Sequence, residues 1–330
     1  MIDGAPSSEV ASPGYEPGRC SACRICGNGI GNREHHAQEI MFGSRKEFPY
    51  LECGSCGCLQ LITAPVDMAL YYPNGYYSFG SPKGMTRLAE FIRKLKNRSY
   101  FGRAFHFGRF WDARHPYLQL RAFSSMKVSR NARILDVGSG SGRFVSDLFS
   151  LGFRNVLGID PFIDSDIKYG GRIAVRKCSL NTIGPGAWDI VMFHHSFEHV
   201  PEPREALDTV RSLLAPDGRC LIRVPVVSWA WNQYGTNWVQ IDAPRHFFLH
   251  TEKSMGILAE KVGLKITRVV YDSTEFQFWG SELSKRGVAS GFVKPEDYFS
   301  RRELADFRTR ALQLNDEHRG DQAVFHLVIH

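Results

Sequence analysis

The chain has 330 residues, of which 43% are hydrophobic and 23% charged, with a formal net charge of +7 and a pI near 9.0. This length predicts about two domains and a core large enough to fold without disulfides. No run approaches the roughly 18 apolar residues of a membrane span, and residues 1–18 lack the basic-then-apolar layout of a signal peptide. We therefore expect a cytoplasmic protein rather than an integral membrane or exported one.

Residues 1–18 are rich in Gly, Pro and Ser, which predicts disorder. Six of the eight cysteines then fall between residues 20 and 58. Without a secretion signal, C-x2-C pairs favour metal over disulfides, because this spacing lets both thiolates reach one tetrahedral Zn²⁺. A redox pair or free thiols are the alternatives. We predict a structural zinc site in a zinc-ribbon-like module over residues 19–65. Its expected ligands are Cys23, Cys26, Cys53 and Cys56, with Cys20 or Cys58 able to replace a neighbour.

Residues 66–131 are expected to form a basic linker or cap, with a helix over residues 84–98. Between Lys83 and Arg133 there are 13 Lys and Arg residues against only two acids. Such a segment suits an anionic partner, which can be a diphosphate, a nucleic acid or the inner face of a membrane. A solvated helical face is the other interpretation.

From residue 132 to residue 330 strands alternate with helices, which predicts a parallel α/β sheet. The turn Pro216-Asp217-Gly218 is expected to lead into the fifth strand, and Thr251 to cap a helix that ends at Gly263. Helices are also expected after the first strand and over residues 202–214. The expected strands cover residues 133–137, 155–160, 173–180, 189–194, 220–227, 264–271 and 323–329.

A glycine-rich loop, DVGSGSG, occupies residues 136–142 and follows the first strand. Its glycines permit a tight turn and let backbone N–H groups approach a ligand closely. Asp160 ends the second strand, where a carboxylate can accept hydrogen bonds from both hydroxyls of a ribose. The pattern predicts a nucleoside cofactor held by Asp136, Gly138, Gly140, Gly142 and Asp160.

The histidine-rich segment HHSFEHVP, residues 194–201, follows the fourth strand at the carboxyl edge of the sheet, where α/β folds bind ligands. A histidine at this place can act as a general base, because its pKa lies near neutrality. Alternatively, these histidines orient the loop or touch the cofactor. We predict His199 as the base, with His195 and His246 as the next candidates, and place His194 at the cofactor.

Residues 134–148, Gly158-Ile159-Asp160-Pro161 and residues 189–200 together resemble the signature segments of class I S-adenosylmethionine-dependent methyltransferases. The resemblance covers about residues 132–330 and implies a seven-stranded Rossmann-like sheet with an antiparallel last strand. It also implies that the glycine loop holds the methionine part of S-adenosylmethionine and that Asp160 holds the ribose. Ser179 and Leu180 fall near the adenine, where the family often has an acid that this chain lacks.

Residues 226–250 form an aromatic-rich insertion, which predicts a lid that grips the substrate through Asp242, Arg245 and His246. Core packing by its tryptophans is the alternative. This insertion and the segment STEFQ, residues 273–277, look similar to methyltransferases of surface-polysaccharide biosynthesis. A zinc module followed by a Tyr-Tyr-Ser stretch, residues 76–78, resembles methyltransferases that act on nucleotide-linked sugars.

These resemblances imply methyl transfer to a hydroxyl, or less readily a carbon, of a sugar, nucleotide-sugar or lipid-linked glycan. A zinc-containing RNA methyltransferase is one alternative, because the basic segment suits RNA. A non-catalytic zinc protein that recruits a partner is a second alternative, against which the intact glycine loop argues.

Overall fold

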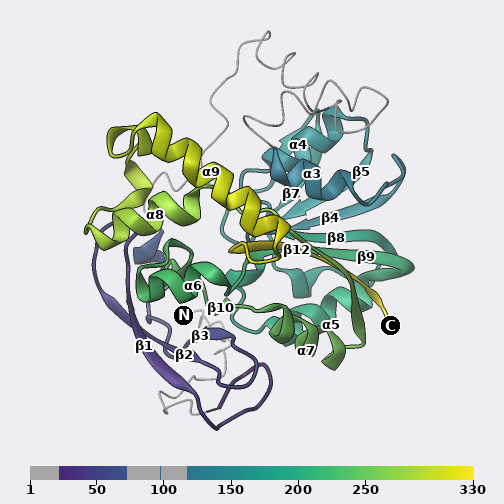
Figure 1. The fold of residues 1–330 in the computed structure, drawn as a ribbon. Helices are drawn as coiled ribbons and strands as arrows, with labels where there is room; N and C mark the ends of the chain where they lie inside the picture. The colour runs from purple at the N-terminus through teal and green to yellow at the C-terminus, as the bar shows by residue number, and fades with distance from the viewer. Residues whose placement is uncertain (1–21, 73–96, 98–116) are drawn as a thin grey trace, which may run out of the picture.

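The computed structural model describes residues 22–72, 97 and 117–330. The helix predicted over residues 84–98, most of the basic segment, the disorder predicted for residues 1–18, and Cys20 therefore lie outside the described residues. The described part of the chain forms one large sheet flanked by helices and one small sheet beside it (Figure 1).

The large sheet has the strand order β11-β12-β9-β8-β4-β5-β7-β6. The five strands from β9 to β7 run parallel, while β12 is antiparallel to both its neighbours, as the resemblance implied for the last strand. The expected count of seven strands is one too low, because a short edge strand, β6, pairs antiparallel with β7. The eight strands are β4 (Arg133–Val137), β5 (Asn155–Ile159), β6 (Ile167–Tyr169), β7 (Arg172–Arg176), β8 (Trp188–His194), β9 (Leu214–Pro225), β11 (Leu264–Tyr271) and β12 (Gln322–Ile329).

Helices cover both faces of this sheet, with α3 and α4 on one face and α5 and α7 on the other (Figure 1). The alternation of side chains along β4 explains the two cores. Ile134 belongs to the cluster that contains Phe144 of α4, whereas Leu135 belongs to the cluster that contains Leu207 of α5 and Met255 of α7. The helices are α3 (Leu118–Ser124), α4 (Arg143–Ser150), α5 (Pro203–Leu213) and α7 (Glu252–Lys261).

Two local expectations have different outcomes. Thr251 caps α7 as predicted, in a capping box with Ser254. The turn expected at Pro216-Asp217-Gly218 is present, but it lies within β9 and not before it. Leu214 pairs with Trp188 and Arg219 with Ile190, and the described residues between Leu214 and Arg219 turn back on themselves without partners on β8. The pairing of β9 with β8 is irregular here, with a shift of register between Trp188 and Ile190.

Three helices escape the sequence prediction: α6 (Trp229–Tyr234) in the insertion, and α8 (Phe276–Lys285) and α9 (Arg301–Asp316) between β11 and β12. In Figure 1, α8 and α9 lie beside α6, and Phe278 of α8 shares a small core with Trp229. No helix in the described residues is both long and apolar enough to cross a membrane. The short 3-10 helices are η1 (Met68–Tyr71), η2 (Leu180–Thr182), η3 (Phe197–His199), η4 (Gly235–Asn237), η5 (Val239–Ile241), η6 (Ser290–Phe292) and η7 (Pro295–Asp297).

The small sheet joins the N-terminal strands to a segment near the middle of the large domain. It has the order β1-β2-β3-β10 with antiparallel neighbours, and its fourth strand lies at the end of the insertion (Figure 1). Four of the clustered cysteines, Cys23, Cys53, Cys56 and Cys58, also share a hydrophobic core with Met255 and Leu258 of α7. The predicted boundary at residue 65 therefore does not separate two cores. The strands are β1 (Arg33–Gln38), β2 (Glu47–Glu52), β3 (Leu59–Leu61) and β10 (Phe248–Leu249).

Candidate active site and cysteine cluster

The glycine loop lies between β4 and α4, at the carboxyl edge of the large sheet. Gly138 and Gly142 adopt φ values of 73° and 71°, a region that favours glycine. A Cβ atom at Gly138 would lie 2.4 Å from Cβ of Ser196, and one at Gly142 would lie 2.5 Å from Cγ2 of Val175. The loop therefore packs directly against Ser196, which follows β8, and against Val175 of β7. Only glycine leaves room for these contacts.

Asp160 lies next to this loop, as predicted, and is 5% exposed. Its Oδ2 accepts a hydrogen bond from the backbone N–H of Gly140, and its Oδ1 accepts one from the N–H of Phe162, both at 2.9 Å. Each carboxylate oxygen keeps a further lone pair, so the group can still accept a hydroxyl. Burial, followed by the charge of Asp160, raises the pKa of Asp136 to about 8. A cationic ligand placed here would favour the carboxylate form of Asp136.

The remaining predicted cofactor residues lie at the same edge. Ser179 and Leu180 follow β7, the neighbour of β5, and both are partly exposed. His194 ends β8 and meets the ring of Phe144 edge-on, with ring centroids 4.9 Å apart. Among the described residues neither ring nitrogen of His194 has a hydrogen-bond partner, and burial holds its pKa well below the usual value.

The three predicted base candidates meet around one carboxylate, that of Glu198. Nδ1 of His195 lies 3.2 Å from Oε1 of Glu198, and Nε2 of His246 lies 4.0 Å from the same oxygen. One ligand atom from each of Glu198, His199 and His246 lies within 4.8 Å of the others. Burial alone would raise the pKa of Glu198, but the hydrogen bond with His195 and the charges of the three histidines lower it to about 2. The sequence analysis named no role for Glu198, although it precedes His199 directly.

Part of the insertion is buried inside the protein and does not form the predicted lid. Arg245 is fully buried, with Nε 2.9 Å from Oδ2 of Asp242 and Nη2 3.1 Å from Oε1 of Glu39. Its Nη1 donates to the carbonyl of Tyr71 at 2.8 Å. The expected grip of Arg245 and Asp242 on a substrate is therefore wrong, because each satisfies the other's charge inside the protein. The buried Trp231 and Trp238 support the alternative of core packing.

The four predicted zinc ligands come together in the structure. The Sγ atoms of Cys23 and Cys56 are 3.6 Å apart, those of Cys26 and Cys53 are 3.5 Å apart, and all four lie within 4.8 Å of one another. Four thiolates at the usual Zn–S distance of about 2.3 Å are separated by roughly 3.8 Å, so this arrangement fits a tetrahedral zinc ion. Cys58 is buried but points its Sγ at the carbonyl of Leu59, 3.5 Å away. It stands apart from the four.

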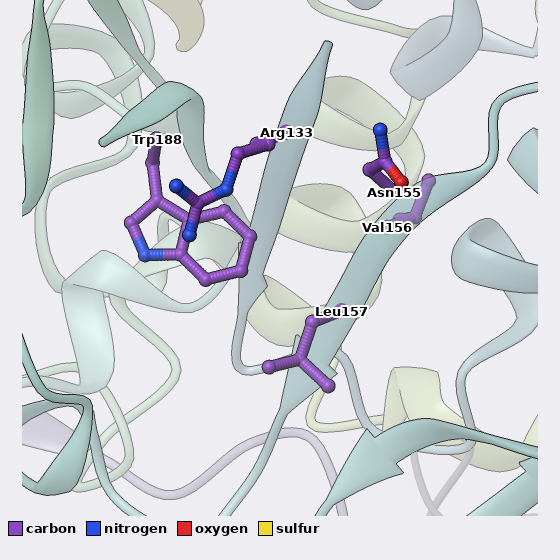
Figure 2. Close-up of a pocket in the computed structure, with 5 residues that line it drawn as sticks. All are labelled: Arg133, Asn155, Val156, Leu157 and Trp188. Atoms are coloured by element: carbon purple, nitrogen blue, oxygen red, sulfur yellow. The ribbon is translucent and has the colours of Figure 1, made fainter. Parts of the chain in front are cut away.

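A pocket of about 350 Å³ opens at the opposite edge of the large sheet. Figure 2 shows its lining residues, with the Arg133 guanidinium over the Trp188 ring, 5.1 Å from the centroid. Strands β4, β5 and β8 begin here. Because α/β sheets bind their ligands at the carboxyl ends of the strands, this pocket is not the candidate active site. The complete lining is Arg133, Asn155, Val156, Leu157 and Trp188.

The strand order, the glycine loop after β4 and the acid after β5 define the fold of a class I S-adenosylmethionine-dependent methyltransferase. Residues 109–269 match the family model described as "Methyltransferase domain". This part of the chain is a methyltransferase domain of that class.

Curated proteins named "Ubiquinone biosynthesis O-methyltransferase" are similar to the chain. The one from Bordetella bronchiseptica is 28% identical over 130 residues, which cover 33% of this chain and 53% of that protein. The one from Colwellia psychrerythraea is 29% identical over 119 residues, with coverage of 32% and 47%. The chain thus spans about half the length of these relatives. A solved SAM-dependent methyltransferase from Archaeoglobus fulgidus shares 18% identity at a TM-score of 0.43, with coverage of 64% and 93%.

Proposed function

We propose that the protein transfers the methyl group of S-adenosylmethionine to a hydroxyl of a sugar, nucleotide-sugar or lipid-linked glycan. The observation that carries this proposal is the gathering of His195, His199 and His246 next to the glycine loop. The hydroxyl of Ser196 donates to the carbonyl of Val137 at 2.6 Å, so the histidine segment is attached to the loop itself.

The residues of the carboxyl edge supply the cofactor site of this proposal. The glycine loop would hold the methionine part and Asp160 the ribose, while Ser179, Leu180 and His194 would lie along the nucleoside. When bound, S-adenosylmethionine supplies an electrophilic methyl group for direct displacement. The work of the protein is then to align an acceptor oxygen with that methyl group and to remove one proton.

His199 is the proposed base, with His195 and His246 as alternatives. Its Nδ1 lies 2.9 Å from the carbonyl oxygen of Arg245, which can only accept, so Nδ1 carries the hydrogen. This leaves the lone pair of Nε2 for the proton of the acceptor. His195 has a side chain 31% exposed and can pass a proton to solvent.

Four further elements complete the proposal: the methylated atom, the acceptor, the zinc ion and the role of the basic segment. The curated relatives are named as O-methyltransferases, which supports oxygen as the methylated atom. The sugar-type acceptor is supported by the resemblance of the insertion and of the zinc module. The four cysteines support a structural zinc ion. The basic segment would then bind a diphosphate or the inner face of a membrane.

Calorimetry with S-adenosylmethionine tests the cofactor site. Asp160→Asn should raise the dissociation constant at least about tenfold, because hydrogen bonds to a charged group contribute roughly 1.5–3 kcal/mol. Asp164→Asn, an exposed change in the same loop, is the matched control. An unchanged constant in Asp160→Asn would mean that the loop binds another ligand.

Release of S-adenosylhomocysteine in the presence of nucleotide sugars and lipid-linked sugars tests the transfer. His199→Asn should lower turnover by about 100-fold or more, the usual contribution of a general base, at unchanged cofactor affinity. Normal turnover in this variant would assign proton removal to another group.

A further inference from the structure

We propose that Glu198, His199 and His246 bind a divalent transition-metal ion beside the glycine loop. The inference stands on the geometry of these three side chains, which belong to two separate segments, η3 and the insertion. Its consequence for catalysis, that the ion holds the oxygen of the acceptor, rests on the function proposed above.

The two histidines are oriented as metal ligands usually are. Nδ1 of His199 lies 2.9 Å from the carbonyl of Arg245, and Nδ1 of His246 lies 2.8 Å from the carbonyl of Gln240. Both Nδ1 atoms therefore carry hydrogen, and both Nε2 atoms keep an unprotonated lone pair. A backbone carbonyl that fixes the ring in this way is the common outer contact of a metal-bound histidine.

Glu198 supplies an independent observation. Its carboxylate is 1% exposed, and among the described residues its Oε2 has no hydrogen-bond partner. A buried carboxylate oxygen without a partner is unfavourable unless a donor or a cation occupies the space beside it. The ligand atoms of Glu198, His199 and His246 lie within 4.8 Å of one another. A bound ion requires separations of roughly 3–3.5 Å, which a side-chain movement of about 1 Å provides.

The charges around the cluster also suit a cation. Asp242 lies 3.7 Å from Nε2 of His246, and its charge is shared with the buried guanidinium of Arg245. Nδ1 of His195 contacts Oε1 of Glu198, the oxygen that also lies 4.0 Å from Nε2 of His246, and His195 stays outside the group of three. Two imidazoles and one carboxylate with open positions suit Mn²⁺, Fe²⁺, Co²⁺ or Zn²⁺ better than Mg²⁺, which prefers oxygen ligands.

Such an ion would give the transfer a specific geometry. A hydroxyl that binds the open position becomes more acidic and releases its proton to water or to His195. The oxygen then forms a bond to the methyl carbon while the bond from that carbon to sulfur breaks, which leaves a methyl ether and a neutral thioether. In the metal-bound form Nε2 of His199 is occupied by the ion, so His195, one of the alternative bases named above, takes over removal of the proton.

Binding of Mn²⁺ to the full-length protein, followed by electron paramagnetic resonance, tests the site. Mn²⁺ is a useful probe because it prefers nitrogen and oxygen ligands and so leaves the cysteine cluster untouched. We expect one bound Mn²⁺ per chain and a rise in the unfolding temperature with Mn²⁺ concentration, since a ligand of the native state stabilises it. This measurement of Mn²⁺ binding needs only the wild-type protein. Absence of binding at millimolar Mn²⁺ would overturn the proposal.

Glu198→Gln keeps the shape of the side chain and should weaken Mn²⁺ binding more than about tenfold, since even outer contacts cost 10- to 100-fold. The matched control is His35→Gln, because His35 also pairs with a glutamate, Glu52, at 2.8 Å but has no third ligand. Unchanged affinity in Glu198→Gln would overturn the assigned ligands. Methyl transfer that survives a chelator would overturn the catalytic consequence and leave the proposed function standing. Mn²⁺ binding by a protein that does not bind S-adenosylmethionine would overturn the proposed function and leave the metal site standing.

Discussion

The cysteine cluster and the cluster of Glu198, His199 and His246 are built in opposite ways. The cysteines come from two tight C-x2-C turns and offer four sulfurs that close around a zinc-sized space. The second cluster combines nitrogen and oxygen ligands, with only three side chains. The first is suited to holding structure and the second to holding a reactant.

The N-terminal strands next to the cysteine cluster also support the second cluster. The small sheet pairs β3, which follows the last cysteines, with β10, which follows His246. The hydroxyl of Tyr50 donates to the carbonyl of His246 at 2.8 Å, and the N–H of Phe247 donates to the carbonyl of Glu198 at 2.8 Å. The N-terminal strands thus hold the insertion against η3. A cluster whose members are distant in sequence depends on this neighbour for its shape.

Removing a cysteine ligand should have the largest effect on stability. Structural zinc contributes an apparent binding energy of roughly 10–16 kcal/mol in small zinc proteins. Cys53→Ser should therefore lose zinc and unfold the small sheet, and the core shared with α7 should lower the unfolding temperature of the whole chain. Metal analysis and thermal unfolding measure both effects. Cys58→Ala is the control, and full zinc content in Cys53→Ser would exclude the four predicted ligands.

Removing the buried ion pair of Arg245 tests how the insertion is joined to the N-terminal strands, because it leaves the proposed metal ligands in place. Arg245→Met removes the cation between Asp242 and Glu39, which leaves two buried carboxylates without their partner. Loss of one partner of a buried pair costs about 3–5 kcal/mol, and denaturant unfolding should show a decrease of that size. A decrease below about 1 kcal/mol would mean that Arg245 is not needed to join the insertion to the N-terminal strands. Lys285→Met, which breaks an exposed pair with Glu282, should change little.

The pH dependence of stability provides a smaller test at His250, which follows β10 directly. His250 is fully buried between Phe197 and Phe248, and burial lowers its pKa to about 4 from an ordinary value of 6.5. The unfolded chain binds this proton more readily than the folded protein. The stabilisation is therefore complete above about pH 6.5 and is lost as the pH falls towards 4.

Between pH 7 and pH 5 this histidine should account for a loss of about 2 kcal/mol in the free energy of unfolding. His250→Phe keeps the aromatic packing and should make that part of the acid loss disappear, although it gives up the contact with Ser254. Urea unfolding at the two pH values measures the difference. Equal losses in wild type and variant would place the sensitivity in another group, for which the buried His246 is the next candidate.

Local patterns succeeded where a short stretch of chain fixes its own geometry. The glycine loop, the cap at Thr251 and the four cysteines are of this kind, because the spacing of a few residues already determines the turn. Strand positions in the large sheet were also predictable, since a buried parallel strand is a short apolar run between turn residues. The turn at Pro216-Asp217-Gly218 shows the limit, because the local pattern located the turn but not the start of β9 before it, at Leu214, which pairs with Trp188 of β8.

The sequence by itself determined the strands and glycine loop of a methyltransferase domain, the residues that could bind its cofactor, and a cysteine set fit for zinc. Only the tertiary structure decided that Arg245 is an internal ion-pair partner instead of a substrate ligand, because its buried partner Glu39 lies far away in the chain. It also decided that Glu198 stands at the centre of the histidines. The sequence shows which side chains can ionise or bind a metal. Which of them meet in a space without water depends on contacts between segments that no local spacing encodes.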